Sequence, residues 1–278
     1  MSDVSGVTPR MVSGSTRLAA VIGQPVHHSR SPAIHNAAYV ATGLDWVFVA
    51  LEVASGRGYD AVRAMPVLGI AGLNVTMPHK ADAARACDEL SADAMTLEVV
   101  NTVVQRDDGS LWGDSTDGVG LIRSLDDAGL DVKGKSVLVL GAGGAARASI
   151  LALGRAGATV TVAARKVDAA AAAAQLAYGG SSTALDAAEA EDFDVVVNAT
   201  PLGMADETLP IAAPGPGQWA VDLIYHPSDT PFLVAARARG AQAVGGIGML
   251  IHQAAIAFEA MTGRPAPLEA MRAAGERP

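Results

Sequence analysis

A glycine-rich turn, Gly141-Ala-Gly143-Gly-Ala-Ala146, constrains the fold of this chain more than any other segment. An apolar strand is expected before it, over 136–140, and a helix after it, over 145–154. In such a turn the first glycine allows the tight bend, the second lets the backbone approach a pyrophosphate, and the small third residue permits helix–strand packing. The helix start adds free N–H groups and a partial positive charge. A second strand over 159–164 completes a unit of roughly 30 residues that is typical of dinucleotide binding.

The end of that second strand indicates which nucleotide is bound. NAD-binding proteins usually place an acidic residue there to accept the ribose hydroxyls. This chain has Ala164, Arg165 and Lys166 instead, and Asp168 comes several residues into the expected following helix. An arginine grips a phosphate through two donors, so the two cations favour the 2′-phosphate of NADP over NAD.

The rest of the chain alternates strand-like and helix-like segments, which predicts an α/β fold with a largely parallel sheet. Ser31 and Pro32 are typical of a helix start, with Ser31 as a possible N-cap. A turn is expected over 107–109. The expected strands are 17–23, 46–51, 69–76, 99–105, 136–140, 159–164, 193–199, 218–224 and 242–244. Besides the helix that starts at Ser31, the expected helices are 59–65, 81–90, 118–128, 145–154, 230–239 and 249–261, and the alanine run 169–174 is a strong helix former.

Composition narrows the class of protein. The 278 residues allow one large domain or two ordinary ones, and the net charge of −9 argues against nucleic acid or an anionic membrane as a partner. No apolar run approaches the ~20 residues of a membrane helix, and residues up to about Ser15 are expected to form a loose tail. The single cysteine, Cys87, cannot form an internal disulfide, so a cytoplasmic setting is expected.

Three polar clusters are candidates for a substrate site. Ser29 and Ser31 flank a helix start, where hydroxyl and N–H groups suit a carboxylate. Asn74 and Thr76 lie at the end of an expected strand, where ligands bind in α/β sheets, and are followed by Lys80. A lysine at a helix start opposes the helix dipole, which favours a functional role.

Asp117 stands at the start of the expected connecting helix, where it could also act as a simple N-cap. A lysine tuned by a carboxylate can deliver the proton that ketone reduction requires, so Lys80 and Asp117 form a candidate proton relay. His27, His28 and His35 could suggest a metal, but no carboxylate or thiol lies within that segment, and no metal site is expected.

Eight motifs together resemble the shikimate dehydrogenase family, in family order, between about Arg17 and Gly263. They occupy residues 23–36, 73–80, 100–102, 115–118, 141–146, 198–204, 222–227 and 246–253. The resemblance implies reversible, NADP-linked interconversion of 3-dehydroshikimate and shikimate, with Lys80 and Asp117 as the catalytic pair and no metal. Two positions depart from the family pattern: Ser115 replaces an asparagine, and Ala164 replaces an asparagine before Arg165.

The same resemblance implies the other site residues. Ser29 and Ser31 hold the substrate carboxylate, and the substrate ring is surrounded by Asn74, Thr76, Asn101, Asp117, Tyr225 and Gln253. The cofactor contacts Gly141, Ala142, Gly143, Gly144, Ala145, Arg165, Lys166, Thr200, Leu223, Gly246 and Met249. Two domains are implied: a discontinuous α/β substrate domain, 1–117 and 246–278, and a Rossmann-like NADP-binding domain, 118–245.

Two alternatives remain open at this stage. One is a quinate/shikimate dehydrogenase that prefers NAD, against which the missing acid at the strand end argues. The other is a non-catalytic nucleotide-sensing relative, against which the retained Lys80 and Asp117 argue. Monomer and homodimer are both compatible with the composition.

Overall fold

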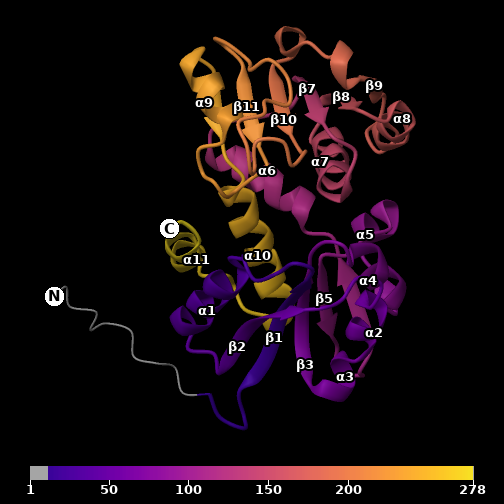
Figure 1. Ribbon diagram of the computed structural model, residues 1–278. Helices are drawn as coiled ribbons and strands as arrows, with labels where there is room; N and C mark the ends of the chain where they lie inside the picture. The colour runs from indigo at the N-terminus through magenta and orange to yellow at the C-terminus, as the bar shows by residue number, and fades with distance from the viewer. Residues whose placement is uncertain (1–11, 278) are drawn as a thin grey trace, which may run out of the picture.

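The computed structural model describes residues 12–277 and contains two six-stranded sheets, each covered by helices (Figure 1). Most of the expected N-terminal tail, residues 1–11, lies outside the described residues, as does residue 278. The expected tail runs to about Ser15, but Ser15 is already held to the fold. The hydroxyls of Ser15 and Thr16 donate to the Asp45 carboxylate at 3.1 and 2.8 Å. None of the helices within residues 12–277 is long and apolar enough to cross a membrane.

The first sheet has the order β2-β1-β3-β5-β6-β4 and is mixed rather than largely parallel. β1, β2 and β3 are parallel, whereas β5 runs antiparallel to both β3 and β6. The short turn around Gly109 returns the chain directly from β5 to β6, and such a hairpin is necessarily antiparallel. The strands are β1 Arg17–Gly23, β2 Trp46–Glu52, β3 Ile70–Val75, β4 Glu89–Leu90, β5 Thr102–Gln105 and β6 Leu111–Asp114.

The helices of this half differ from the sequence expectation at two places. The helix expected over 81–90 ends at Ala86, and Glu89 pairs with Trp112 in the short strand β4. The helix expected over 59–65 is α2, which already ends at Arg63, and α3 follows it. Pro66 lies in the first turn of α3, where a proline loses no hydrogen bond. The helices are α1 Ser31–Ala41, α2 Gly58–Arg63, α3 Met65–Leu68, α4 Lys80–Ala86 and α5 Ala92–Leu97.

The second sheet is entirely parallel, with the order β12-β11-β10-β7-β8-β9. This is the strand order of a doubly wound dinucleotide-binding sheet, whose ligand site lies where the order reverses, between β7 and β10. Its strands are β7 Ser136–Leu140, β8 Thr159–Ala164, β9 Ser181–Ala184, β10 Val195–Asn198, β11 Trp219–Asp222 and β12 Gln242–Val244, and its helices are α7 Gly144–Arg155, α8 Val167–Ala174 and α9 Pro231–Ala238. The predicted α/β fold with a Rossmann-like domain is confirmed.

Two crossing helices, α6 (Asp117–Asp127) and α10 (Ile247–Thr262), connect the two sheets (Figure 1). They approach closely because glycines stand at the crossing: a Cβ on Gly120 would lie 2.9 Å from the Gln253 backbone nitrogen, and one on Gly248 would lie 2.2 Å from Ser124 Oγ. After α10 the chain forms α11 (Leu268–Gly275), which packs on α1 of the first half. The C-terminal segment therefore returns to the N-terminal sheet.

Cys87 ends α4 and lies partly buried beneath Gly113. Burial and the neighbouring Asp88 carboxylate raise the pKa of the Cys87 thiol to about 12. Because the thiolate is the reactive form, only about one molecule in 10⁴ is reactive at pH 8. We expect iodoacetamide to alkylate the folded protein far more slowly than the protein unfolded in urea, and mass spectrometry of timed samples measures both rates. Equal rates in the two states would contradict this assignment.

Candidate active site

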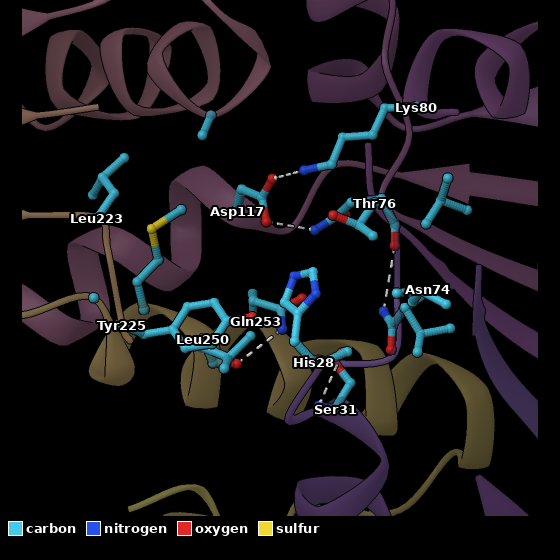
Figure 2. Close-up of a pocket in the computed structure, with 18 of the residues that line it drawn as sticks. His28, Ser31, Asn74, Thr76, Lys80, Asp117, Leu223, Tyr225, Leu250 and Gln253 are labelled. Carbon is cyan, nitrogen blue, oxygen red and sulfur yellow. Dashed lines mark hydrogen bonds and ion pairs between the residues drawn. The ribbon is translucent and has the colours of Figure 1, made fainter. Parts of the chain in front are cut away.

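A cavity of about 180 Å³ lies between the two halves of the molecule (Figure 2). The N-terminal ends of three of the longer helices, α1, α6 and α10, converge on it through Ser31, Asp117 and Gly246. Helix N-termini favour negative charge, so their convergence suits an anionic ligand. The lining residues are Val21, Pro25, Val26, His28, Ser29, Ser31, Asn74, Val75, Thr76, Lys80, Asn101, Asp117, Ala145, Leu223, Tyr225, Gly246, Met249, Leu250 and Gln253.

Lys80 and Asp117 form an ion pair at the wall of this cavity, with 2.5 Å between Lys80 Nζ and Asp117 Oδ2 (Figure 2). Each is the first residue of its helix, α4 or α6, so neither is an N-cap. Their side chains are only 19% and 12% exposed, which limits the screening of the pair by water. An ammonium held by a carboxylate beside a cavity is suited to proton transfer.

Asn101 fixes the carboxylate of Asp117 from the other side. Asn101 Nδ2 donates to Asp117 Oδ1 at 2.7 Å, while Asn101 Oδ1 accepts from the backbone N–H of Thr116 at 2.8 Å. The Asn74 amide nitrogen donates in turn to the carbonyl of Asn101 at 3.3 Å and to Thr102 Oγ1 at 3.2 Å. These buried side chains form one continuous polar chain from β3 to the N-terminus of α6.

Ser29 and Ser31 lie at the start of α1 and both line the cavity. Ser31 is not the N-cap, because Arg30 occupies that position and Ser31 is the first helical residue. Ser31 N–H donates to Ser29 Oγ at 3.3 Å, so the two serines are held together. Arg30 Nη1 donates to the carbonyls of Gly275 and Arg277 at 2.8 and 2.6 Å, which ties this loop to α11.

The opposite wall comes from the second sheet and from α10. Tyr225 follows β11, and burial raises the pKa of its hydroxyl. Gln253 Nε2 donates to the Leu250 carbonyl at 2.9 Å, which orients its amide within α10. A Cβ on Gly246 would lie 2.2 Å from the Leu223 carbonyl oxygen, so only glycine permits this approach.

The glycine turn adjoins the cavity through Ala145. Gly141 has φ +112°, and neither Gly143 nor Gly144 has a described heavy atom within 4 Å of the position of a Cβ. Gly143 is the N-cap of α7 and carries no side-chain cap, which leaves the first N–H groups of the helix available to a ligand. Ala146 is fully buried against the sheet. These features fit a dinucleotide pyrophosphate.

The two cations that the sequence assigns to the 2′-phosphate lie directly after β8. Arg165 and Lys166 are exposed there, and within residues 12–277 neither forms an ion pair or hydrogen bond with its side chain. Asp168 is the second residue of α8 rather than several residues into it, but both cations precede it. Thr200 follows β10 and lies beside Gly141, with its hydroxyl bound to Asn198 Oδ1 at 2.7 Å.

Comparisons with known proteins agree with this geometry. The substrate-binding domain model of shikimate dehydrogenase matches residues 21–103, the C-terminal domain model of shikimate 5′-dehydrogenase matches 246–274, and a putative NAD(P)-binding model matches 128–214. The NADP⁺-dependent shikimate dehydrogenase of Moorella thermoacetica is 42% identical, over 94% of this chain and 92% of its own. The chain belongs to the shikimate dehydrogenase family. The enzyme of that name from Methanopyrus kandleri is 41% identical, over 95% of this chain and 96% of its own.

Solved structures of the shikimate dehydrogenase family share the whole fold. The Thermus thermophilus enzyme in complex with NADP(H) and shikimate superimposes with a TM-score of 0.86 and 35% identity, covering 94% of this chain and 99% of that one. A quinate dehydrogenase from Corynebacterium glutamicum in complex with NAD superimposes with a TM-score of 0.86 and 32% identity, covering 93% and 98%. The fold is therefore common to enzymes with different substrates and cofactors.

The structure places most of the expected site residues of this family member together. Residues that sequence reasoning does not single out as ligand contacts include His28, which precedes Ser29 on the same loop and which the sequence suggests only as a metal ligand. Ser115, the departure beside Thr116, is buried and does not line the cavity, and its N–H donates to Asp114. Among residues 12–277, no group of three or more His, Cys, Asp or Glu side chains could hold a metal ion.

Proposed function

We propose that this protein is a shikimate dehydrogenase that reversibly reduces 3-dehydroshikimate to shikimate with NADPH, in aromatic amino-acid biosynthesis. The observation that carries the proposal is the Lys80–Asp117 pair in a cavity that the dinucleotide turn adjoins. Relatives about 40% identical over nearly the whole chain bear this name, and the Thermus thermophilus structure holds NADP(H) and shikimate.

Lys80 is the proton donor in this proposal. The bound cofactor supplies the hydride that converts the ketone to an alcohol. Lys80 Nζ gives a proton to the oxygen as negative charge develops on it, and takes the proton back in the reverse direction. Asp117 keeps the ammonium aimed at the cavity, and Asn101 fixes the Asp117 carboxylate.

The substrate is expected to lie with its carboxylate at Ser29 and Ser31, where the α1 N-terminus favours an anion. Its ring and hydroxyls are assigned to the polar side chains of the other walls. These are Asn74, Thr76, Asn101, Asp117, Tyr225 and Gln253. The cavity of about 180 Å³ is smaller than the roughly 300–1,000 Å³ of most ligand pockets, which suits a single small ring.

NADP is assigned to the second half of the molecule. The pyrophosphate would be held by Gly141, Ala142, Gly143, Gly144 and Ala145, and the 2′-phosphate by Arg165 and Lys166. Gly246 and Met249 would lie near the nicotinamide, with Thr200 and Leu223 as further cofactor contacts. The unpaired cations after β8 and the absence of an acid at the end of that strand support NADP over NAD.

The domain division follows from the same assignment. Residues 1–117 and 246–278 are assigned to the substrate domain, and residues 118–245 to the NADP-binding domain. Within the described residues 12–277, the contacts of α10 and α11 with α1 support this division. We propose a cytoplasmic enzyme that acts as a monomer or homodimer.

The decisive assay incubates purified protein with shikimate or quinate and with NADP or NAD, and follows the absorbance of the reduced nicotinamide. We expect the highest kcat/KM with shikimate and NADP. No reduction of NADP at saturating shikimate would reject the proposal. Faster turnover of quinate with NAD would favour the alternative that the Corynebacterium glutamicum neighbour illustrates. Tight nucleotide binding without turnover of either acid would favour a sensor.

A further inference from the structure

His35 is a buried imidazole for which the proposed reaction has no use. It lies on the inner face of α1, has no exposed surface, and stacks on Phe48 with a centroid distance of 4.2 Å and an interplanar angle of 4°. Burial lowers the pKa of His35 to about 3, and its contact with the Asn74 side chain opposes that shift only in part. The ring is therefore neutral near pH 7 and offers one N–H donor and one nitrogen acceptor.

Within the described part of the chain, the side-chain oxygen of Asn74 lacks a hydrogen-bond donor, and the His35 imidazole has a donor without an acceptor. The Asn74 amide nitrogen donates to Asn101 and Thr102, but Asn74 Oδ1 is buried and accepts no hydrogen bond of good geometry among residues 12–277. The two ring nitrogens of His35 likewise have none among these residues. Asn74 pairs with Val21 of β1, which packs with α1 in the same core cluster as Phe48, so His35 lies over this part of the sheet. A buried acceptor without a donor is costly, and the imidazole N–H of His35, which contacts the Asn74 side chain, can satisfy it.

We propose that His35 is a positioning residue that donates its ring N–H to Asn74 Oδ1 and thereby sets the orientation of the Asn74 amide in the substrate cavity. With the oxygen of Asn74 held toward His35, its nitrogen must face Asn101 and Thr102, as observed. Asn101 in turn holds Asp117, and Asp117 holds Lys80. The stacked Phe48 keeps the imidazole in the required plane.

The orientation of the Asn74 amide matters because the opposite orientation would place two acceptors together. If the Asn74 amide turned over, its NH₂ group would face His35 and its oxygen would face the Asn101 carbonyl, so two acceptors would meet. The proposal rests on the proposed function because it assigns Asn74 to the substrate, but the contact between His35 and Asn74 is testable without it.

The kinetic test compares wild type, His35→Phe, His35→Gln, Asn74→Ala and the His35→Phe/Asn74→Ala double variant, with shikimate and NADP. His35→Phe keeps a ring on Phe48 but removes the donor. We expect it to raise the KM for shikimate, with kcat/KM falling roughly tenfold to hundredfold, the range found when residues that orient metal ligands from behind are removed. The KM for NADP should not change, and His35→Gln, which retains a donor, should recover part of the loss. In the Asn74→Ala background, His35→Phe should cause no further loss.

A matched control separates positioning from general destabilisation. Ile34→Val alters the neighbouring buried residue of α1 without touching the polar chain, so its KM for shikimate should equal that of wild type. The two single variants and the double variant form a double-mutant cycle, which is also measured by urea unfolding. The losses of unfolding free energy caused by His35→Phe and by Asn74→Ala should not add in the double variant. Additive effects of the two substitutions, both on kcat/KM for shikimate and on the free energy of unfolding, would overturn the proposal. An inactive wild type with non-additive unfolding would leave the His35–Asn74 contact standing and reject only the function.

Discussion

Lys80→Ala is expected to lower kcat for shikimate oxidation by roughly a hundredfold to ten-thousandfold, the range that positioned acid–base groups contribute. The reason is that Lys80 Nζ is the group proposed to take the hydroxyl proton of shikimate in this direction, and alanine leaves no amine beside Asp117 to take it. Dissociation constants for shikimate and NADP, measured by calorimetry, should stay close to those of wild type. The serines and the glycine turn that are proposed to hold these ligands are unaffected by the substitution.

Two further variants sharpen this test. Lys133→Ala removes an exposed lysine of the loop before β7, and it should keep the wild-type kcat. Asp117→Asn should also reduce kcat, because it removes the charge that holds the Lys80 ammonium. Partial recovery of Lys80→Ala by added methylamine would identify the missing group as an amine. A kcat near the wild-type value in Lys80→Ala would reject Lys80 as the proton donor.

The dinucleotide half of the fold is largely predictable from sequence. The unit β7–α7–β8 is continuous in the chain, so its apolar strands and glycine turn carry local signals. β12 is short, but Gly240 and the preceding helix mark its start. β9 escapes prediction because Ser181–Ala184 is a polar edge strand without apolar alternation.

The substrate half is less predictable because its pairing is not local. The sequence predicts β5 and the turn after it, but not the antiparallel partner β6, and it assigns the short strand β4 to a helix. It also gives no signal for α5 and α11. The sequence predicts that Lys80 and Asp117 act as a pair, from their chemistry and from the family resemblance. The short distance between the two side chains depends on tertiary structure, because α4 and α6 start at the same edge of the mixed sheet. The proposed contact of His35 with Asn74 has no sequence signature, since the two residues lie on different elements, α1 and β3.

Arg165→Ala/Lys166→Ala is expected to reduce the preference for NADP over NAD by roughly a hundredfold, because each cation–phosphate hydrogen bond typically contributes about tenfold or more to affinity. Both side chains are exposed after β8, and neither is engaged by another described side chain, so each can reach a 2′-phosphate. The KM for NADP should rise strongly. The KM for NAD, which has no 2′-phosphate, should change little, so the ratio of the two kcat/KM values is the quantity to measure.

The single variants then decide how the two cations share the phosphate. Arginine offers a fork of donors that matches the phosphate oxygens, whereas lysine is a mobile point charge, so Arg165→Ala should cost more than Lys166→Ala. A clear loss in Lys166→Ala as well indicates that this lysine compensates for the asparagine replaced by Ala164. Rising salt should weaken NADP binding to wild type more than to the double variant, since the charges that salt screens are then absent. Lys133→Ala again serves as the control, because it also removes one positive charge but at a position distant in sequence from the end of β8. An unchanged NADP-to-NAD ratio in the double variant would place the 2′-phosphate on other groups and return NAD to consideration as the cofactor.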